Sequence, residues 1–205
     1  MARSKSSSGW LKEHFDDQYV KKSQESGYRA RSAYKLEEIA EKFQLFNGTK
    51  AVVDLGAAPG GWCQVVQAKS PATELIIGLD LLPIVPIEGI DFIEGDFTVD
   101  AVYEELLTLL GSRKIDLVLS DMAPNLSGMS AMDQPRCMLL AEMALEFCQQ
   151  ALQPGGAHVV KLFQGEDFDQ HIQNIRQSFN KVVIYKPKSS RPRSREVFAV
   201  ALGFK

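Results

Sequence analysis

Short apolar runs alternate with amphipathic stretches along nearly the whole chain of 205 residues. Among the amphipathic stretches, residues 32–43 place apolar side chains at helical spacing, at Ala33, Leu36, Ile39, Ala40 and Phe43. The pattern predicts helices at 9–25, 32–43, 62–69, 99–110, 133–152 and 166–179. The apolar runs between them are shorter and predict strands at 51–55, 75–80, 91–96, 115–121, 157–163, 181–185 and 196–202.

The order of these elements indicates the fold class. Strands and helices alternate, which predicts an α/β fold with a mostly parallel sheet of seven strands and helices on both faces. A loop without a helical pattern joins the last two strands, so we expect an antiparallel hairpin at the sheet edge. One domain is expected at 9–205, with N-terminal helices in 9–48 and a core in 49–205, after a disordered basic segment at 1–8.

Composition excludes several classes of protein. Hydrophobic residues make up 45% and charged residues 24% of the chain, which is ordinary for a soluble globular protein. No apolar run approaches membrane-spanning length, and the polar N-terminus lacks the apolar core of a signal peptide. Cys63, Cys137 and Cys148 form no C-x-x-C pair, which favours a reducing compartment over a disulfide framework or a zinc site. We therefore expect a cytoplasmic protein without a metal.

Charge is distributed unevenly along the chain. Residues 1–50 hold ten Lys or Arg and seven Asp or Glu, residues 51–180 hold six and eighteen, and residues 181–205 hold seven and one. Local basic patches attract phosphates even when the net charge is −3, as it is here. The segment 186–195 has five bases and no acid. We interpret it as a loop that faces nucleic acid, with a solvated charged surface as the alternative.

The most informative stretch is a glycine-rich turn, residues 54–62, which reads D-L-G-A-A-P-G-G-W between a predicted strand and a predicted helix. Glycines let the backbone approach a ligand, and the first N–H groups of the helix face the same space. The spacing is neither the dinucleotide fingerprint G-x-G-x-x-G nor a P-loop. A second acid, Asp80, ends the next strand, where nucleoside-binding folds hold ribose hydroxyls. With Asp54, it indicates a nucleoside-containing cofactor.

Further polar residues follow strands at the same edge of the sheet. Asp80, Asp96 and Asp121 each end a predicted strand, and ligands bind outside the carboxyl ends of parallel strands. Each acid taken singly is equally well explained as a helix cap or a turn former. Lys161 lies among apolar neighbours, where a lysine is costly unless it is paired or functional. The alternative is a lysine that snorkels from a strand end.

The turn resembles the S-adenosylmethionine site of class I methyltransferases, and most of all that of the FtsJ/RrmJ family of RNA ribose 2′-O-methyltransferases. The likeness runs from about residue 9 to residue 203 and is strongest to the bacterial branch that acts on 23S ribosomal RNA. It implies a Rossmann-like class I methyltransferase fold. It also implies that the cofactor S-adenosylmethionine contacts Gly60, Trp62, Asp80, Asp96 and Asp121. Cys63, where serine is expected, is a mild departure.

Among these contacts we expect different roles. Asp80 is assigned to the ribose hydroxyls of the cofactor, Asp96 to its adenine amino group, and Asp121 to its methionine part near the reacting centre. These roles suit the chemistry, because carboxylates accept hydrogen bonds from hydroxyl and amino groups.

The resemblance also implies a Lys-Asp-Lys-Glu tetrad, which falls on Lys35, Asp121, Lys161 and Glu196. Lys161 is the expected general base for a ribose 2′-hydroxyl, with Asp121 orienting it. Lys35 and Glu196 are expected to position the ribose. In a competing version Lys161 stays charged and steers the hydroxyl, while the proton is lost to water.

The implied function is methylation of a uridine 2′-hydroxyl in the A-loop of 23S ribosomal RNA, within the large ribosomal subunit. The alternatives are methylation of a tRNA anticodon loop or an mRNA cap, a small-molecule methyltransferase, and a non-catalytic ribosome-assembly factor. We expect a monomer without an obligate protein partner. Tyr19, Tyr28 and Tyr34 are candidates for base stacking or for partial core. The candidate phosphate contacts are Lys21, Lys22, Arg29, Arg31, Lys188, Arg191, Arg193 and Arg195.

Overall fold

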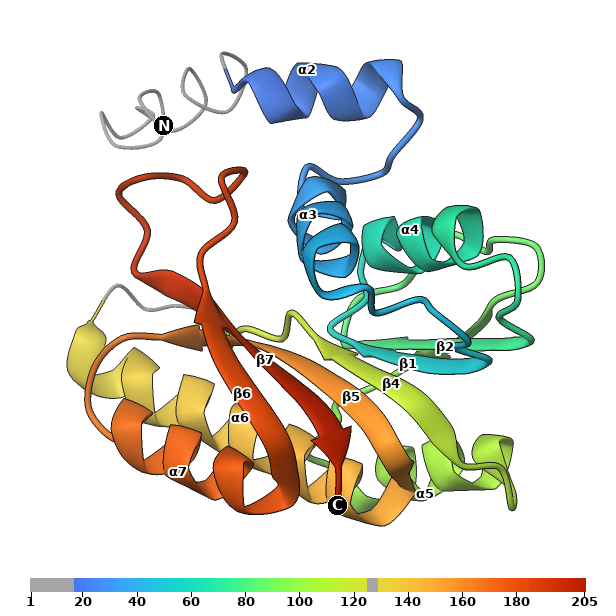
Figure 1. Cartoon of the computed structure of the whole chain (residues 1–205). Coiled ribbons are helices and arrows are strands. Elements are labelled where there is room, and N and C mark those ends of the chain that lie inside the picture. The colour runs from blue at the N-terminus through green and yellow to red at the C-terminus, as the bar shows by residue number, and fades with distance from the viewer. Residues whose placement is uncertain (1–16, 125–128) are drawn as a thin grey trace, which may run out of the picture.

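Six helices and seven strands make up the described part of the computed structural model, residues 17–124 and 129–205 (Figure 1). The helices are α2 (Gln18–Glu25), α3 (Ala33–Phe43), α4 (Gly61–Lys69), α5 (Asp100–Leu110), α6 (Ser130–Ala151) and α7 (Phe168–Ser178). The strands are β1 (Ala51–Leu55), β2 (Leu75–Asp80), β3 (Asp91–Glu94), β4 (Ile115–Ser120), β5 (Leu152–Phe163), β6 (Phe179–Tyr185) and β7 (Glu196–Phe204). The predicted disorder at 1–8, and the first part of the helix predicted at 9–25, lie outside the described residues.

The strands form a single mixed sheet in the order β3-β2-β1-β4-β5-β7-β6. Strand β7 runs antiparallel to both β5 and β6, and the other pairings of the described strands are parallel. This confirms the predicted α/β fold and the antiparallel hairpin at the edge. The chain proceeds from β1 outward to β3 and then returns to β4 on the other side of β1. Ligands in open α/β sheets bind at such a reversal, outside the carboxyl ends of the strands.

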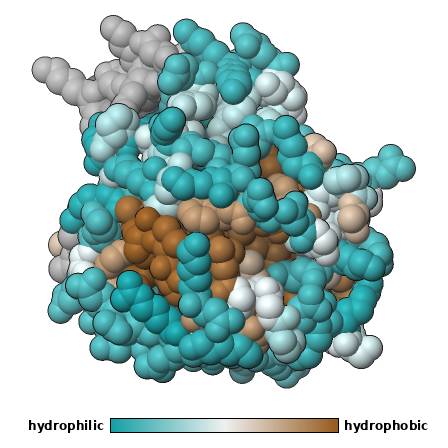
Figure 2. Space-filling model, in the orientation of Figure 1, coloured by the Kyte–Doolittle hydropathy of each residue, from teal (hydrophilic) through white to brown (hydrophobic). Residues whose placement is uncertain are grey.

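Helices cover both faces of the sheet, as predicted (Figure 1). Because successive strand residues point to opposite faces, β1 divides its side chains between two cores. Val52 packs on the side of α3 and α4, whereas Val53 and Leu55 pack on the side of α5, α6 and α7. Figure 2 shows that apolar residues remain visible between these two helical layers. None of the described helices combines the length and the apolar character needed to cross a bilayer.

Strand β5 begins earlier than the sequence predicts. The pattern predicts a strand that begins at 157, but β5 follows α6 directly, and Leu152 already pairs with Ile115. The next pair joins Ala157 to Leu117, so the register shifts and the intervening residues bulge out. Gly155 has a φ of +85°, a conformation that favours glycine and explains how this turn-like sequence fits inside a strand.

An aromatic cluster ties the N-terminal helices together. The ring of Tyr34 lies 5.7 Å from that of Tyr19 and 5.6 Å from that of Tyr28, between centroids. The hydroxyl of Tyr34 donates to the carbonyl of Lys22 at 2.9 Å, and the side chain is 5% exposed. Tyr34 therefore belongs to the core, while Tyr19 and Tyr28 are half-buried against it.

Candidate active site

The glycine-rich turn joins β1 to α4 and holds its shape through the neighbouring strand ends. The N–H groups of Gly56 and Ala57 donate to the carbonyl of Leu79, at the end of β2, at 2.8 and 3.1 Å. A Cβ at Gly56 would lie 2.7 Å from the backbone nitrogen of Met122, so only glycine fits between the turn and the segment after β4. Gly60, with a φ of +105°, is the N-cap of α4.

A pocket of about 230 Å³ opens where the carboxyl ends of β1, β2, β3 and β4 meet. The three acids predicted to share this edge, Asp80, Asp96 and Asp121, all line it. Apolar walls complete it, formed by Leu79, Leu81, Leu82, Phe97, Met122 and Leu140. Apolar walls with a few converging polar groups are typical of a small-molecule site.

Two of these acids shape turns and face the pocket at once. Asp80 accepts hydrogen bonds from the N–H groups of Ala58 and Leu82, both at 2.9 Å. Asp96 accepts from the N–H of Thr98 at 2.9 Å and from its hydroxyl at 2.7 Å, both at Oδ1. The turn-forming and ligand-binding interpretations of these acids are therefore compatible, because a carboxylate has more lone pairs than these bonds use.

Gly60 and Trp62 do not line this pocket. The indole of Trp62 is 2% exposed, donates to the carbonyl of Ser32 at 2.8 Å and packs against Phe198 at 5.9 Å between ring centroids. The side chain thus fastens α4 to α3 within the core. A cofactor contact at Trp62 would therefore fall to its backbone, in the first turn of α4.

The four residues of the expected tetrad form two ion pairs. The ammonium of Lys161, in β5, lies 2.8 Å from Oδ1 of Asp121 and donates to the backbone carbonyl of Asp121 at 2.7 Å. The ammonium of Lys35, in α3, lies 2.6 Å from Oε1 of Glu196, which also accepts from the hydroxyl of Ser190 at 2.8 Å. Asp121 is the most exposed of the four side chains at 18%, so both pairs are largely shielded from water.

The register of β5 and β7 places the two pairs on one face of the sheet. Lys161 lies opposite Phe198, and Phe163 lies opposite Glu196. Since directly opposed residues share a face, Lys161 and Glu196 are diagonal neighbours, for which about 7–8 Å is usual. The ammonium of Lys35 lies 5.6 Å from the ring centroid of Phe198. The tetrad is therefore one cluster, and Asp121 joins it to the pocket.

Asp54, in β1, does not line the pocket, and the sequence assigned it no role of its own. It is fully buried under the turn, where the thiol of Cys63 lies 3.2 Å from its Oδ2 and donates to it. Burial raises the pKa of Asp54 to about 7, and the charges of Asp121 and Asp80 add to this, while the Cys63 hydrogen bonds oppose it. Its position as the first residue of the glycine-rich turn was the signal available in the sequence.

Arg29, a candidate phosphate contact, is engaged elsewhere. Its guanidinium donates to the carbonyls of Pro59, Val85 and Pro86, at 3.2, 2.5 and 3.2 Å. It therefore clamps the segment after β2 against the glycine-rich turn. Three of its five N–H donors are bonded to backbone carbonyls, which holds the guanidinium in place, so the structure favours a positioning role.

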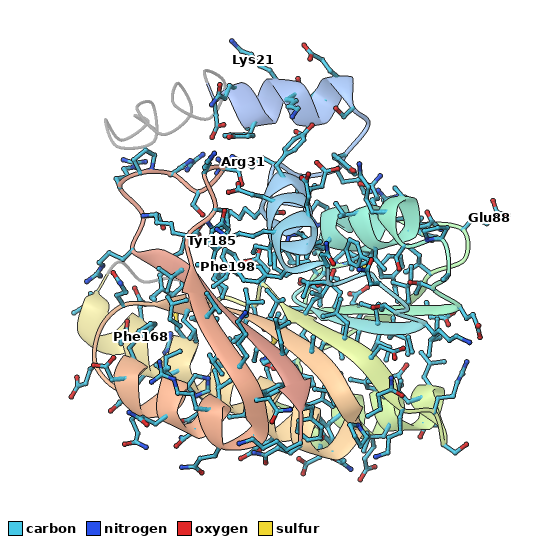
Figure 3. All side chains as sticks on the ribbon, viewed as in Figure 1. Lys21, Arg31, Glu88, Phe168, Tyr185 and Phe198 are labelled. Atoms are coloured by element: carbon cyan, nitrogen blue, oxygen red, sulfur yellow. The ribbon has the colours of Figure 1, made fainter. Side chains whose placement is uncertain are left out.

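Other basic candidates gather around a groove beside the tetrad. It is lined by Arg31, Lys35, Arg191, Arg193, Ser194 and Glu196. Glu38 of α3 anchors the loop between β6 and β7, because its carboxylate accepts from the N–H of Lys188 at 2.9 Å and from the hydroxyl of Tyr185 at 2.5 Å. Lys21 and Lys22 are exposed on α2. The groove unites basic segments from both parts of the chain, and Figure 3 shows Arg31 just above α3.

Comparisons with known proteins agree with the family resemblance of the sequence. The family model of FtsJ-like methyltransferases matches residues 28–204. A "Ribosomal RNA large subunit methyltransferase E" from Hydrogenovibrio crunogenus is 50% identical over 205 residues, which cover the whole of both chains. One of the same name from Cellvibrio japonicus is 51% identical over 204 residues, 100% of this chain and 97% of that relative.

Solved structures share the fold. A crystal structure from Plasmodium falciparum, assigned as a ribosomal RNA methyltransferase, has a TM-score of 0.76 and 29% identity, and it covers 86% of this chain and 98% of the other. Human methyltransferase-like protein 13, solved with SAH, has a TM-score of 0.59 at 14% identity, over 82% of this chain and 81% of the other. The second likeness shows the fold alone.

Proposed function

Since the chain belongs to the FtsJ-like methyltransferase family, we propose that it methylates a ribose 2′-hydroxyl of large-subunit ribosomal RNA with S-adenosylmethionine as the donor. The main observation in support is that two shielded ion pairs, Lys161–Asp121 and Lys35–Glu196, lie together beside a pocket lined by acids. The names of the two relatives that match the whole chain support the ribosomal substrate.

The pocket suits the cofactor chemically. Asp80 accepts from the ribose hydroxyls, Asp96 accepts from the adenine amino group through the oxygen that its turn does not use, and the apolar walls hold the ring. Asp121 faces the methionine part, and the backbone N–H of Trp62 adds a donor from the first turn of α4. The N–H of Gly60 already donates to the carbonyl of Ala57 at 2.6 Å, so Gly60 contributes through the shape of the turn. When bound, the cofactor supplies an electrophilic methyl group on a sulfonium.

The tetrad positions and activates the hydroxyl. Asp121 holds the ammonium of Lys161 through both its carboxylate and its carbonyl, and Glu196 holds Lys35, so each lysine has a defined direction. With S-adenosylmethionine bound, the 2′-oxygen would take the methyl group from the sulfonium, the thioether would be left behind, and the hydroxyl proton would leave. Lys161, once it has released a proton, accepts this one as the general base. In the competing version it remains an ammonium that steers the oxygen, and water takes the proton.

We assign the target to a uridine in the A-loop of 23S ribosomal RNA, as the family resemblance implies. The anticodon loop of tRNA is the competing substrate, and a non-catalytic assembly factor is the competing class. All four residues of the tetrad are present, which favours an enzyme over a non-catalytic assembly factor.

The test is transfer of labelled methyl from S-adenosylmethionine to purified large subunits, naked ribosomal RNA and tRNA, side by side. Label in the subunits, mapped to a ribose of the A-loop, is the expected result. Label in tRNA alone would show that tRNA is the substrate in place of ribosomal RNA. Cofactor binding without label in any RNA would support the assembly factor instead.

A further inference from the structure

Asp17 lies between two arginines of the basic groove. Its Oδ2 is 2.9 Å from Nε of Arg31, which precedes α3, and 3.5 Å from Nε of Arg191, in the loop between β6 and β7. Figure 3 shows Arg31 between α2 and this loop. A single carboxylate oxygen thus bridges the two segments that form the walls of the groove.

Asp17 lies close to both arginines, but the Nε–H groups of the arginines are not aligned with its carboxylate. The side chain of Asp17 is 10% exposed, and those of Arg31 and Arg191 are 17% and 23% exposed. Yet neither Nε–H is directed at an acceptor within the described residues, although both nitrogens are buried. The carboxylate of Asp17 therefore offsets the charge of the two guanidinium groups, but it leaves both Nε–H donors without a hydrogen bond. An anion with more oxygens, spread in more directions, would satisfy these donors better.

The position along the groove fits a phosphodiester. The same groove is lined by Lys35 and Glu196, the pair expected to position the target ribose. Arg31 also donates to the carbonyl of Ser189 at 2.6 Å, so its guanidinium is held in place independently of Asp17. The groove therefore places fixed cationic groups beside a ribose site, as an RNA backbone requires.

We propose that Asp17 is an internal stand-in for an RNA phosphate, which occupies a phosphate subsite between Arg31 and Arg191 until substrate RNA displaces it. This rests on the proposed function, because the displacing anion is the phosphodiester backbone of the RNA substrate. The carboxylate leaves the two guanidinium groups, a phosphate takes its place, and no covalent bond changes.

The element that carries Asp17 is suited to such a movement. Helix α2 has eight residues, of which Val20 and Ser23 are buried. It lies above α3 and away from the sheet (Figure 1). Its displacement would break the bond from Tyr34 to the carbonyl of Lys22 but would leave the two cores that flank the sheet in place. Asp17 is also the N-cap of α2, where Oδ1 accepts from the N–H of Tyr19 at 2.9 Å. The helix and its acid therefore move as one unit.

Such a stand-in acts as a device for specificity. An RNA that cannot place a phosphate between the two arginines meets a carboxylate there, and like charges repel. An RNA that places one there exchanges one anion for another at little cost. Asp17 therefore weakens binding of all RNA, and weakens it most for the wrong RNA.

The test removes the charge and keeps the cap. Asp17→Asn and Asp17→Ser both retain an N-cap acceptor. The RNA used is naked ribosomal RNA, with tRNA as the competitor. Both variants should bind ribosomal RNA about 3- to 10-fold more tightly at low salt. The slope of log K against log salt should steepen by up to ~0.7, as for one more phosphate contact on a single strand. The preference for ribosomal RNA over tRNA should fall.

Glu25→Gln is the matched control, since it removes one acid from the exposed end of the same helix. Affinity for RNA should change less than 2-fold in this variant. Equal or weaker RNA binding by both Asp17 variants, in protein with wild-type circular dichroism, would overturn the proposal and make Asp17 a support for the arginines. Failure of the wild type to methylate ribosomal RNA would instead overturn the proposed function, and the two failures are read from separate assays.

Discussion

At the scale of single residues, the site depends on charges that are buried in pairs. Lys161 and Lys35 each have an acid within 3 Å, at 2.8 and 2.6 Å. Removing one member of a buried pair leaves an unpaired charge, which is more costly than the pair itself. Substitutions at these positions therefore need to preserve the charge if they are to report on chemistry.

Lys161→Arg meets this condition, because it keeps a cation beside Asp121 but cannot act as a base near neutral pH. We expect kcat to fall by 10²- to 10⁴-fold, the usual contribution of general base catalysis, while the affinity for S-adenosylmethionine, measured by calorimetry, stays near that of the wild type. Lys50→Arg, at an exposed pair with Glu74, is the control. Retained activity with a flat profile of rate against pH would exclude Lys161 as the base and favour the steering version.

Two fully buried ionisable residues should give the stability of the protein pH dependences of opposite sign. Burial raises the pKa of Asp54 from 3.8 to about 7 and lowers the pKa of His158 from 6.5 to about 4. The Asp54 contribution is present below pH 3.8 and is lost as the pH rises toward 7, because the charged form is costly to bury. The His158 contribution is present above pH 6.5 and is lost as the pH falls toward 4, because the unfolded chain takes up the proton first.

Between pH 4 and 6.5 these slopes should largely cancel in the wild type. Asp54→Asn should reveal the His158 slope, with a loss of about 3 kcal/mol in the free energy of unfolding from pH 6.5 to 4, at about 1.4 kcal/mol per pKa unit. His158→Gln should reveal the reverse slope. Urea unfolding of the three proteins across this range provides the measurement. Identical pH profiles would contradict the assignment.

At the scale of elements, segments between strands and helices build most of the site. The segment after β2 holds Leu81 and Leu82 at the pocket and is clamped by Arg29 through two of its carbonyls, those of Val85 and Pro86. Because the same guanidinium also binds the carbonyl of Pro59, it joins this segment to the glycine-rich turn. The clamp thus shapes the end of the pocket where we propose that the adenosine binds.

Arg29→Lys should therefore weaken cofactor binding more than RNA binding. A lysine ammonium lacks the planar fork that reaches several carbonyls at once. We expect the Kd for S-adenosylmethionine to rise about 5- to 20-fold, from the loss of one or two hydrogen bonds to a charged donor, with little change in the KM for RNA. Lys181→Arg, at an exposed position of β6 that is not among the candidate phosphate contacts, is the control. A raised KM for RNA with unchanged cofactor affinity would instead show that Arg29 contacts an RNA phosphate.

At the scale of the whole molecule, the proposed cofactor pocket and the basic groove have different origins in the chain. The pocket arises from the centre of the sheet, at the carboxyl ends of neighbouring parallel strands. The groove arises where the segment before α3 meets the loop between β6 and β7, and the bond from Arg31 to Ser189 spans 158 residues. Asp121 and Glu196 connect the two regions through the tetrad.

The sequence by itself determined the elements, the α/β fold and the acids of the pocket. Hydrophobic periodicity is local, and parallel strands bring their carboxyl ends to one edge, so Asp80, Asp96 and Asp121 were predicted together and lie together. The predicted boundary was wrong at the start of β5, where a turn-like sequence is accommodated as a bulge. The family resemblance identified the four tetrad residues, because their motifs are short and occur in order.

Only the tertiary structure decided which charges pair. It paired Lys161 with Asp121 and Lys35 with Glu196, buried the indole of Trp62, turned Arg29 toward backbone carbonyls and brought Asp17 to Arg31 and Arg191. Each of these contacts joins segments at least 14 residues apart, as with Asp17 and Arg31. A local pattern specifies how a segment folds and which face it buries, whereas the partner of a long charged side chain depends on what the packing of distant segments places within its reach.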